Sequence, residues 1–337
     1  MIGAIVPVRA LLRWTLLIGA VTYPVAIGGL VSALAFIGER WWPTTVALYL
    51  PGALFAAPLP LLTLALLVWG PRWLLIGQAL AAGLILFPLM GLELGGAAPQ
   101  ASTSIRVLSY NVDFGTGSRP DVREEIARAG ADVVLLQGSD RRIFDRLKQT
   151  FAGMDTRRAG EFYIASRYPI LDFYEPPPLD GDLGAGFVRA TLDTPIGVLD
   201  VYNLHPVSPR PGFEAMRENG QLVAPENTGK VERNAAVRGR QLAALAAHAH
   251  AARNPVVLAG DTNLPGLSPL LREHLGDYQD GFAEVGRGFG YTFPAHRWPW
   301  MRIDRILAGP ELYFVKFTVG DRRGSDHLCV IADLARR

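Results

Sequence analysis

The hydrophobic positions of this chain form two different patterns, which meet near residue 100. Before that point, three long apolar runs carry no charged side chain; they span residues 14–37, 46–69 and 73–92. A helix of about 20 apolar residues is long enough to cross the roughly 30 Å hydrocarbon core of a bilayer. After residue 104, the apolar runs are short and end in polar positions, which is typical of strands. The pattern predicts a three-helix transmembrane region at 1–94, a linker at 95–104 and one folded domain at 105–337.

A signal peptide or a buried helical hairpin fits the long apolar runs less well than membrane spans do. A cleaved signal peptide would account only for the first run. Buried helices of soluble proteins are rarely free of polar side chains over such a length. Tryptophans also stand at the ends of the runs, where an aromatic belt would meet the membrane surface: Trp14, Trp41, Trp42, Trp69 and Trp73. We therefore expect an integral, multi-pass membrane protein.

The arginines that flank the apolar runs predict how the protein is oriented in the membrane. Arg9 and Arg13 precede the first run, and Arg72 lies between the second and third, so three spans place all of these on one side of the membrane. Arg40, between the first and second runs, lies on the other side. Because the more basic side normally faces the cytoplasm, we expect the domain outside it, in the periplasm of a cell that has one.

Composition limits the function of the second part of the chain. Residues 101–337 carry 29 basic and 29 acidic residues, and this neutral balance argues against a sequence-independent nucleic-acid binder, which needs a basic surface. The single cysteine, Cys329, excludes an internal disulfide and a cysteine-based zinc site.

Polar side chains follow most of the predicted strands. The predicted strands cover residues 105–110, 132–136, 162–165, 197–204, 255–259, 302–307 and 328–334. Helices are expected at 120–129 and 231–252, and a long polar loop at 206–230. Many short strands with few helices indicate an α+β sandwich of two sheets, with functional residues gathered at one edge.

The polar ends carry a series of short motifs in a fixed order. They are SYNV at 109–112, LLQ at 135–137, SRYP at 166–169, NLH at 203–205, GDTN at 260–263, ID at 303–304 and SDH at 325–327. This set resembles the endonuclease/exonuclease/phosphatase superfamily, which includes DNase I, exonuclease III, neutral sphingomyelinase and inositol-polyphosphate phosphatases. With the three apolar runs, the chain looks like a bacterial membrane-anchored branch of that family. The resemblance implies a four-layered α/β/β/α sandwich of the DNase I type and phosphoester hydrolysis that depends on Mg²⁺, or on Mn²⁺, at the inner membrane.

The histidines of these motifs suit proton transfer. His327 is a candidate general base or acid, because an imidazole with a pKa of about 6.5 can serve near neutral pH. By resemblance, Asp304 pairs with His327 and fixes its tautomer. The resemblance also implies that His205 holds a phosphoryl oxygen or protonates the leaving group.

Oxygen-bearing side chains of the same motifs suit a hard metal ion. The resemblance implies that Asp326 is a metal ligand, and that Asp261 orients or deprotonates the attacking water or binds the metal. Asn111 and Asn263 are neutral amides that can bind a phosphate oxygen, or a metal through the carbonyl. Arg167 of the SRYP motif is a further candidate for substrate contact.

Two loops lie next to these motifs. Residues 291–301 precede Asp304 and are expected to rim the active site, where Trp298 and Trp300 would meet lipid headgroups or stack on a base. Ordinary packing of these two aromatic side chains against the sandwich is the alternative. Residues 206–230 follow His205 and are a candidate substrate-side lid.

One position departs from the family pattern. The family reads Leu-Gln-Glu where this chain has Gly138 after Gln137, so the most characteristic metal-ligand carboxylate is missing. Three consequences of this change stay open. It disables the enzyme; or Asp140 or Asp113 replaces the carboxylate; or Mg²⁺ binds through Asp326, Asn111 and additional waters.

These observations predict a membrane-anchored phosphodiesterase, with a lipid or another small phosphoester slightly favoured as substrate. A nuclease acting on DNA outside the cytoplasm is the first alternative, because the histidine pair matches DNase I. A catalytically weakened or inactive binding protein is the second alternative, because of Gly138.

Overall fold

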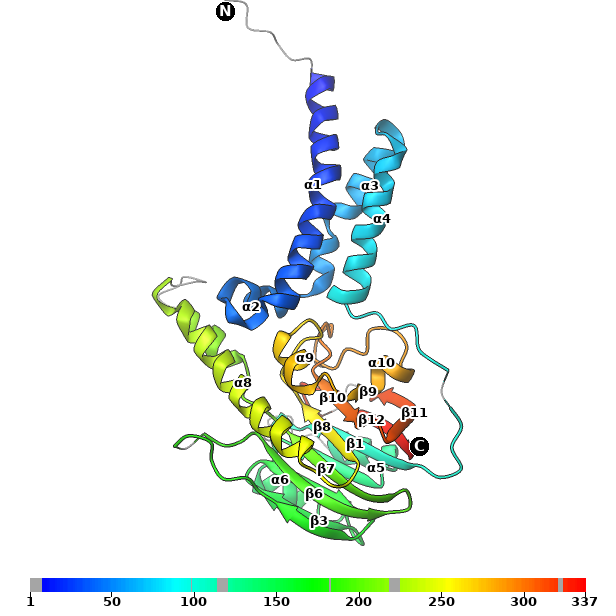
Figure 1. Cartoon of the computed structure of the whole chain (residues 1–337), viewed down its shortest axis with the longest axis vertical. Helices are drawn as coiled ribbons and strands as arrows, with labels where there is room; N and C mark the ends of the chain where they lie inside the picture. The colour runs from blue at the N-terminus through cyan, green and yellow to red at the C-terminus, as the bar shows by residue number, and fades with distance from the viewer. Residues whose placement is uncertain (1–7, 98, 114–120, 182, 218–224, 321–323) are drawn as a thin grey trace, which may run out of the picture.

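The computed structural model describes residues 8–97, 99–113, 121–181, 183–217, 225–320 and 324–337. Its amino-terminal helices stand on top of a sheet-rich domain (Figure 1). The helices and helical turns of this region are α1 (Val8–Phe36), η1 (Gly38–Arg40), α2 (Trp42–Leu48), η2 (Gly52–Ala56), α3 (Pro58–Trp69), η3 (Arg72–Leu74), α4 (Leu75–Leu84) and η4 (Ile85–Leu89). Three helical stretches, Ala10–Phe36, Gly52–Trp69 and Arg72–Leu89, are long and apolar enough to cross a membrane.

The second apolar run differs from the continuous helix expected at 46–69. The first residues of this run belong to α2, which ends at Leu48, and a new helical stretch begins at Gly52. Pro51 lies between them, and proline has no N–H to continue a helix and disfavours the helical conformation of the residue before it. Residues 37–51 therefore form a separate segment between the first two of these apolar helical stretches.

The domain consists of two six-stranded sheets. The first has the order β11-β12-β1-β2-β4-β3, and the second has the order β5-β6-β7-β8-β10-β9. The first sheet contains β1 (Ile105–Asn111), β2 (Val133–Gln137), β3 (Asp155–Ala159), β4 (Phe162–Ser166), β11 (Leu312–Val319) and β12 (Val330–Arg336). The second contains β5 (Ile170–Tyr174), β6 (Phe187–Thr194), β7 (Gly197–Leu204), β8 (Val256–Asp261), β9 (Gln279–Asp280) and β10 (Asp304–Ala308).

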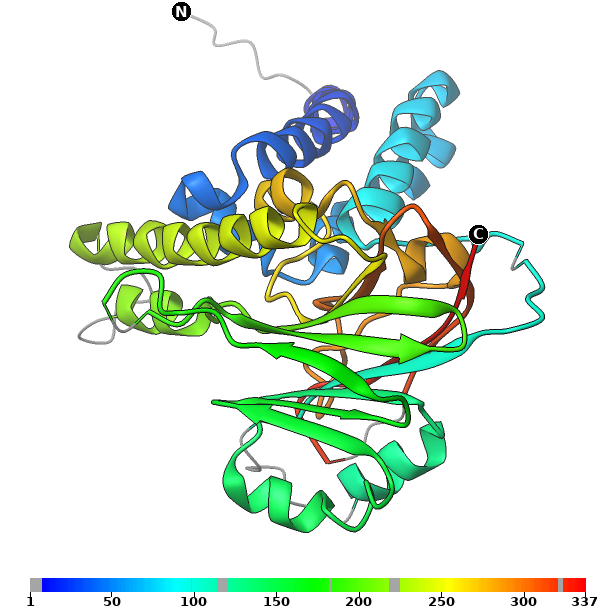
Figure 2. The same cartoon turned by 60° about the horizontal axis from the view of Figure 1, so that its bottom comes forward.

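Helices cover the outer faces of both sheets, so the domain has four layers (Figure 2). Apolar side chains between the sheets, such as Val107 of β1 and Val257 of β8, form the central core. The other helices of the domain are α5 (Asp121–Ala129), α6 (Arg141–Leu147), α7 (Arg210–Met216), α8 (Thr228–His250), α9 (Pro269–Leu275) and α10 (Gly281–Val285). Side chains of α5 and α6 pack on the first sheet, and those of α8 and α9 on the second. The fold is the expected α/β/β/α sandwich of the DNase I type.

The two predicted helices are confirmed as α5 and α8, although α8 starts three residues earlier than expected. The polar segment 206–230 is not a structureless loop, because it contains α7 and the short helical turn Pro225–Asn227. Residues 218–224 of the candidate lid lie outside the described part of the chain.

Candidate active site

The central strands of the two sheets deliver polar side chains to one edge. β1 is parallel to β2, and β7 is parallel to β8, so the carboxyl ends of each pair lie together. β10 runs antiparallel to β8, and its first residue, Asp304, lies opposite Asp261, the last residue of β8. β12 runs antiparallel to β1, and Ser325, just before β12, donates a hydrogen bond from Oγ to the Asn111 carbonyl at 2.7 Å.

His327 and Asp304 form a buried pair in this cluster. The Nδ1 atom of His327 lies 2.8 Å from Oδ2 of Asp304, and its Nε2 atom lies 3.6 Å from Oδ2 of Asp261. Burial lowers the pKa of His327, but the negative charges of Asp304 and Asp261 outweigh this effect and raise the pKa to about 10. Burial raises the pKa of Asp304, and the adjacent imidazolium of His327 offsets only part of this increase. The pair therefore holds a proton at neutral pH.

His205 is held in the same way by a residue that the sequence motifs do not contain. Its Nδ1 atom lies 3.0 Å from Oε2 of Glu161, and its Nε2 atom lies 3.6 Å from Oδ2 of Asp261. Burial lowers the pKa of His205, but the hydrogen bond to Glu161 and the charge of Asp261 raise it by more. Glu161 follows Gly160 in the turn between β3 and β4, and an isolated glutamate in a turn carries no sequence signal of such a role.

Asp261 is the carboxylate that both histidines face. Asn111 donates a hydrogen bond from Nδ2 to Oδ2 of Asp261 at 3.0 Å, and the backbone N–H of Asn263 donates to Oδ1 at 2.8 Å. The Oδ1 atom of Asn111 accepts from the backbone of Asp113 at 3.0 Å. The side chain of Asn263 donates to the carbonyl of Pro206 at 3.0 Å, which turns its Nδ2 atom away from Asp261.

The oxygen atoms of this cluster fit a divalent metal ion. Asp261, Asp304 and His327 bring potential ligand atoms within 4.8 Å of one another. Asp304 is already paired with His327, whereas Oδ1 of Asp326 is buried and receives no hydrogen bond from the described residues. That carboxylate oxygen lies 3.9 Å from Nε2 of His327. Asp326 lines the same cavity as Asp261 and Asn111, and their carboxylate and amide oxygens are of the hard type that Mg²⁺ prefers.

The cluster opens into a cavity of about 450 Å³. Its polar wall consists of Asn111, Asp113, His205, Asp261, Asn263, Asp326 and His327. The rest of the lining is mainly apolar but includes two arginines and a glutamate; it consists of Tyr49, Ser208, Pro209, Arg210, Phe213, Glu214, Arg217, Phe293, Met301 and Ile303. The arrangement can hold an anion against the histidines with an apolar group beside it.

Three predicted substrate contacts lie elsewhere. β4 is antiparallel to β2, so Arg167, which follows β4, lies beside Asp132 at the start of β2, the opposite edge from the site; their side chains are 3.8 Å apart. Trp298 is 86% exposed, and neither it nor Trp300 lines the cavity. Trp300 instead donates a hydrogen bond from Nε1 to the carbonyl of Tyr49 at 3.1 Å.

Two motif residues, Gln137 and Asn203, form hydrogen bonds within the fold and do not line the cavity. Gln137 donates from Nε2 to Oδ1 of Asn203 at 2.7 Å, and Asn203 donates to the carbonyl of Leu136 at 2.9 Å. These bonds join the two sheets below the site. The LLQ and NLH motifs are therefore joined by a hydrogen bond between the sheets. Of their residues, His205 belongs to the polar cluster.

Asp140 and Asp113, the two candidates to replace the carboxylate that is missing at Gly138, lie in different surroundings. Asp140 caps α6 by accepting a hydrogen bond from the Ile143 N–H at 2.8 Å, which fits a helix cap rather than a metal ligand. Asp113 lines the cavity. Gly138 itself is buried and has a backbone φ of 59°, a conformation that favours glycine.

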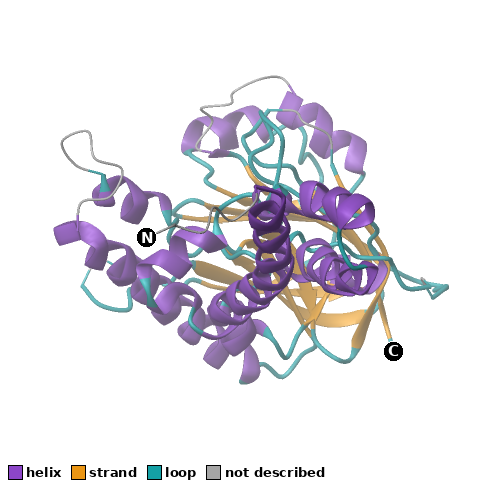
Figure 3. Cartoon of the chain, turned by 90° about the horizontal axis from the view of Figure 1, so that it is seen from above, coloured by secondary structure: helices purple, strands orange, loops and turns teal. Residues whose placement is uncertain are grey.

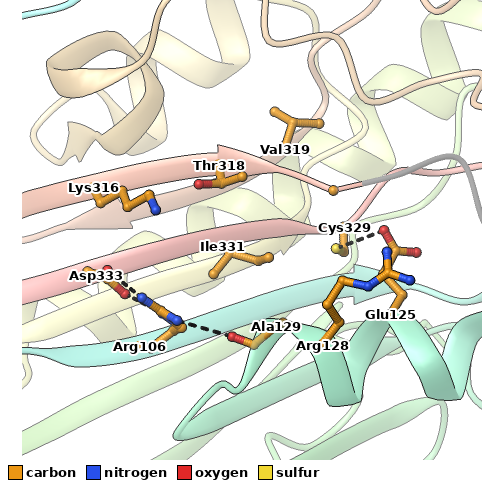
Figure 4. A pocket seen from close by; sticks show the side chains of 11 residues that line it. Arg106, Glu125, Arg128, Ala129, Lys316, Thr318, Val319, Cys329, Ile331 and Asp333 are labelled. Carbon is orange, nitrogen blue, oxygen red and sulfur yellow. Dashed lines mark hydrogen bonds and ion pairs between the residues drawn. The ribbon is translucent and has the colours of Figure 1, made fainter.

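A second cavity, of about 280 Å³, lies on the outer side of the first sheet, beside α5 (Figure 4). Arg106 pairs there with Asp333 at 2.6 Å, and the thiol of Cys329 donates to Glu125 at 3.4 Å. None of the residues of the histidine cluster lines this cavity, which is therefore separate from the candidate active site.

The two stacked sheets and the polar cluster at one edge define a DNase I-like phosphoesterase fold. The sequence matches the Endonuclease/Exonuclease/phosphatase family over residues 108–327, and the chain belongs to this family of metal-dependent phosphoester hydrolases. No curated protein sequence matches the chain.

Solved structures share this fold at low sequence identity. The endonuclease/exonuclease/phosphatase of Bacteroides vulgatus is 17% identical with a TM-score of 0.51, and the match covers 70% of this chain and 100% of that chain. TDP2 of D. rerio, humanized by 14 mutations, is 18% identical with a TM-score of 0.51, and the match covers 69% and 99% of the two chains. These similarities establish the fold of the domain.

Proposed function

We propose that the protein is a membrane-anchored, divalent-metal-dependent phosphodiesterase that acts on lipid or other small phosphoesters. The observation that supports this proposal most directly is the pair of histidines that face Asp261 in the 450 Å³ cavity. Each histidine is fixed by a carboxylate on its other nitrogen, so each presents Nε2 to the cavity.

Glu161 and Asp304, the carboxylates paired with His205 and His327, stabilise the protonated imidazoles and favour the acid role over the base role. Two protonated imidazoles can donate hydrogen bonds to phosphoryl oxygens and a proton to the leaving oxygen, where charge develops in the transition state. Asp261 is the carboxylate within reach of both, and it would orient the attacking water. Asn111 holds Asp261 in place through its amide.

Asp261, Asp326 and Asn111 are the residues that would hold Mg²⁺ or Mn²⁺. The ion would neutralise charge on the phosphoryl oxygens and lower the pKa of a bound water. The fit rests on the unpartnered, buried Oδ1 of Asp326 among the described residues.

We also propose the domain limits and the location expected from the sequence: spans within 1–94, a linker at 95–104, and a domain at 105–337 outside the cytoplasm of a bacterial cell. The three apolar helical stretches support the anchor. The arginine distribution supports the orientation.

The test uses the full-length protein in detergent, with Mg²⁺ or a chelator, and three substrates: a chromogenic phosphodiester, phospholipid and plasmid DNA. We expect metal-dependent cleavage of the chromogenic diester and of phospholipid. Cleavage of DNA alone would instead support a nuclease. No cleavage of any substrate would support the second candidate, a binding protein, which the absence of a carboxylate at Gly138 favours.

The site assignment is tested by His327→Ala and Asp261→Ala. Loss of a general acid or base usually costs about 10²–10⁴ in rate, so both variants should lose at least a hundredfold in kcat. His274→Ala, on the outer helix α9, is the matched control and should keep the wild-type rate. Less than about a tenfold loss in both variants would place the active site elsewhere.

A further inference from the structure

We propose that segment 37–51, between the first two apolar spans, contributes Tyr49 to the lining of the active-site cavity, and that Tyr49 selects phosphoesters whose apolar part is held in the bilayer. The inference rests on the proposed phosphodiesterase function, and it names the substrate class of that site.

Segment 37–51 is bound to the domain by several polar contacts. Arg40 forms an ion pair with Glu273 of α9, and the backbone N–H of Trp42 donates to Glu232 of α8 at 3.1 Å. Glu39 is 3% exposed and accepts a hydrogen bond from Ser268, the residue that caps α9. Oε1 of Glu39 is hydrogen-bonded, whereas Oε2 is buried without a hydrogen-bond partner among the described residues. The interface therefore rests on the three contacts together, not on a fully compensated carboxylate.

Tyr49 links this interface to the candidate active site. Its hydroxyl donates to the carbonyl of Asn263 at 2.8 Å and accepts from Arg238 of α8 at 3.3 Å. Its ring packs edge-on against Phe213 of α7, with ring centroids 5.3 Å apart. Tyr49 lines the same cavity as His205 and His327. The cavity is therefore incomplete without a residue from the amino-terminal region.

Segment 37–51 lies directly next to the ends of the first two apolar spans. The first span ends at Phe36 and the second begins at Gly52, and both ends face the domain (Figure 1). Tyr49 lies only three positions before the second span. Exposed apolar side chains lie on the same side of the domain: Trp41 is 51% exposed and Leu50 is 42% exposed. Seen from above, the spans project over the sheets that carry the site (Figure 3).

The cavity itself suits an amphiphilic phosphoester. Tyr49, Phe213 and Met301 offer apolar surface in the same cavity as the histidines. Arg210 and Arg217 add positive charge to the lining and Glu214 adds a negative charge; Arg210 lies 3.5 Å from Asp326. A phosphate that reaches the histidines would place its apolar substituent beside Tyr49, and a lipid can do so without leaving the membrane surface.

The kinetic test compares two substrates with full-length protein in phospholipid nanodiscs: the disc phospholipid and a soluble chromogenic phosphodiester. In Tyr49→Ala, the ratio of kcat/KM for lipid to kcat/KM for the soluble diester should fall at least tenfold. Tyr49→Phe keeps the ring and should hold the ratio within about threefold of wild type. Tyr313→Ala, at a half-buried tyrosine of β11, is the matched control. An unchanged ratio in Tyr49→Ala would overturn the proposal.

A second measurement does not depend on turnover. Phe213 is replaced by p-benzoylphenylalanine, and the protein is irradiated in discs that contain radiolabelled phospholipid. We expect a lipid adduct at position 213, reduced at least fivefold by Tyr49→Ala, and none when the photoreactive residue replaces Tyr313. Absence of an adduct at position 213 would overturn the proposal.

The two measurements separate this inference from the proposed function. Cleavage of the soluble diester without a lipid adduct would keep the phosphodiesterase and remove the membrane-held substrate. A lipid adduct without cleavage of either substrate would keep the lipid-facing lining and reject the hydrolase.

Discussion

At the scale of single residues, the site is organised around one carboxylate shared by two imidazoles. The Oδ2 atom of Asp261 lies 3.6 Å from Nε2 of both His205 and His327. The Nδ1 atom of His205 is held by Glu161, and that of His327 by Asp304. Such carboxylate partners set both the tautomer and the charge of a histidine. The protonation of the site therefore depends on residues that do not themselves line the cavity.

Glu161→Gln tests this dependence. The hydrogen bond and the charge of Glu161 raise the pKa of His205, so neutralising Glu161 should lower that pKa. If His205 acts in its protonated form, activity is lost as pH rises through its pKa. The alkaline limb of the pH–kcat/KM profile should therefore move to lower pH in the variant. Glu175→Gln, at an exposed position on the same domain, should leave the profile unchanged. An unshifted alkaline limb in Glu161→Gln would exclude His205 as the group that titrates there.

At the scale of elements, the site depends on where strands stop. β1 and β8 lie at the centre of their sheets, and the chain leaves each with a polar residue, Asn111 or Asp261. β2 ends beside β1, but it is followed by Gly138 in the left-handed region, with a φ of 59°. The backbone at this position is thus adapted to glycine, and a side chain there must overcome strain.

Gly138→Glu separates the two effects of this position. The left-handed conformation should cost about 1–2 kcal/mol of unfolding free energy in both Gly138→Glu and Gly138→Ala. Only the glutamate adds a carboxylate near Asn111, so it should raise Mg²⁺ affinity and phosphodiesterase activity at least tenfold over Gly138→Ala. Thermal unfolding and an Mg²⁺ titration of diester cleavage measure the two effects. Equal Mg²⁺ dependence in both variants, with an active wild type, would show that another residue such as Asp113 has taken the role.

At the scale of the whole molecule, the apolar helices and the domain share an interface. Glu39, Arg40 and Tyr49 contact α9, α8 or the loop after β8, and Glu93 pairs with Gly288 at the other side of the helices. Contacts on both sides of the helical region fix the site at a defined distance from the spans. In the proposed membrane-anchored protein, the orientation of these helices decides which side of the membrane the site serves.

A reporter fusion tests that orientation. Three spans with arginines before the first and between the second and third should place the carboxyl terminus outside the cytoplasm. A reporter that is active only in the periplasm should give signal when it is fused after Arg337. The same reporter fused after Gly70, between the second and third spans, should be silent. Signal from the second fusion and not from the first would reverse the topology.

Much of the fold could be predicted from local pattern. The apolar spans, the helices α5 and α8, and the strands that carry Asn111, His205 and Asp261 all follow from periodicity and from polar residues at strand ends. The predicted strands do not include β3, β5, β6, β9 and β11. In β6 and β11, polar residues such as Arg189 and Lys316 interrupt the apolar runs. Inside the sheet these side chains lie at partly buried or exposed positions, which the local sequence does not reveal.

The sequence by itself determined which residues stand at strand ends, and its motif order indicated the family and the histidine cluster. Only the tertiary structure placed Glu161 against His205, 44 positions away, and Tyr49 against Asn263, 214 positions away. It also moved Arg167 to the opposite edge, because β4 runs antiparallel to β2. Periodicity is a property of neighbouring residues, whereas these contacts depend on strand direction, on the stacking of two sheets and on the docking of the helices, which no local pattern encodes.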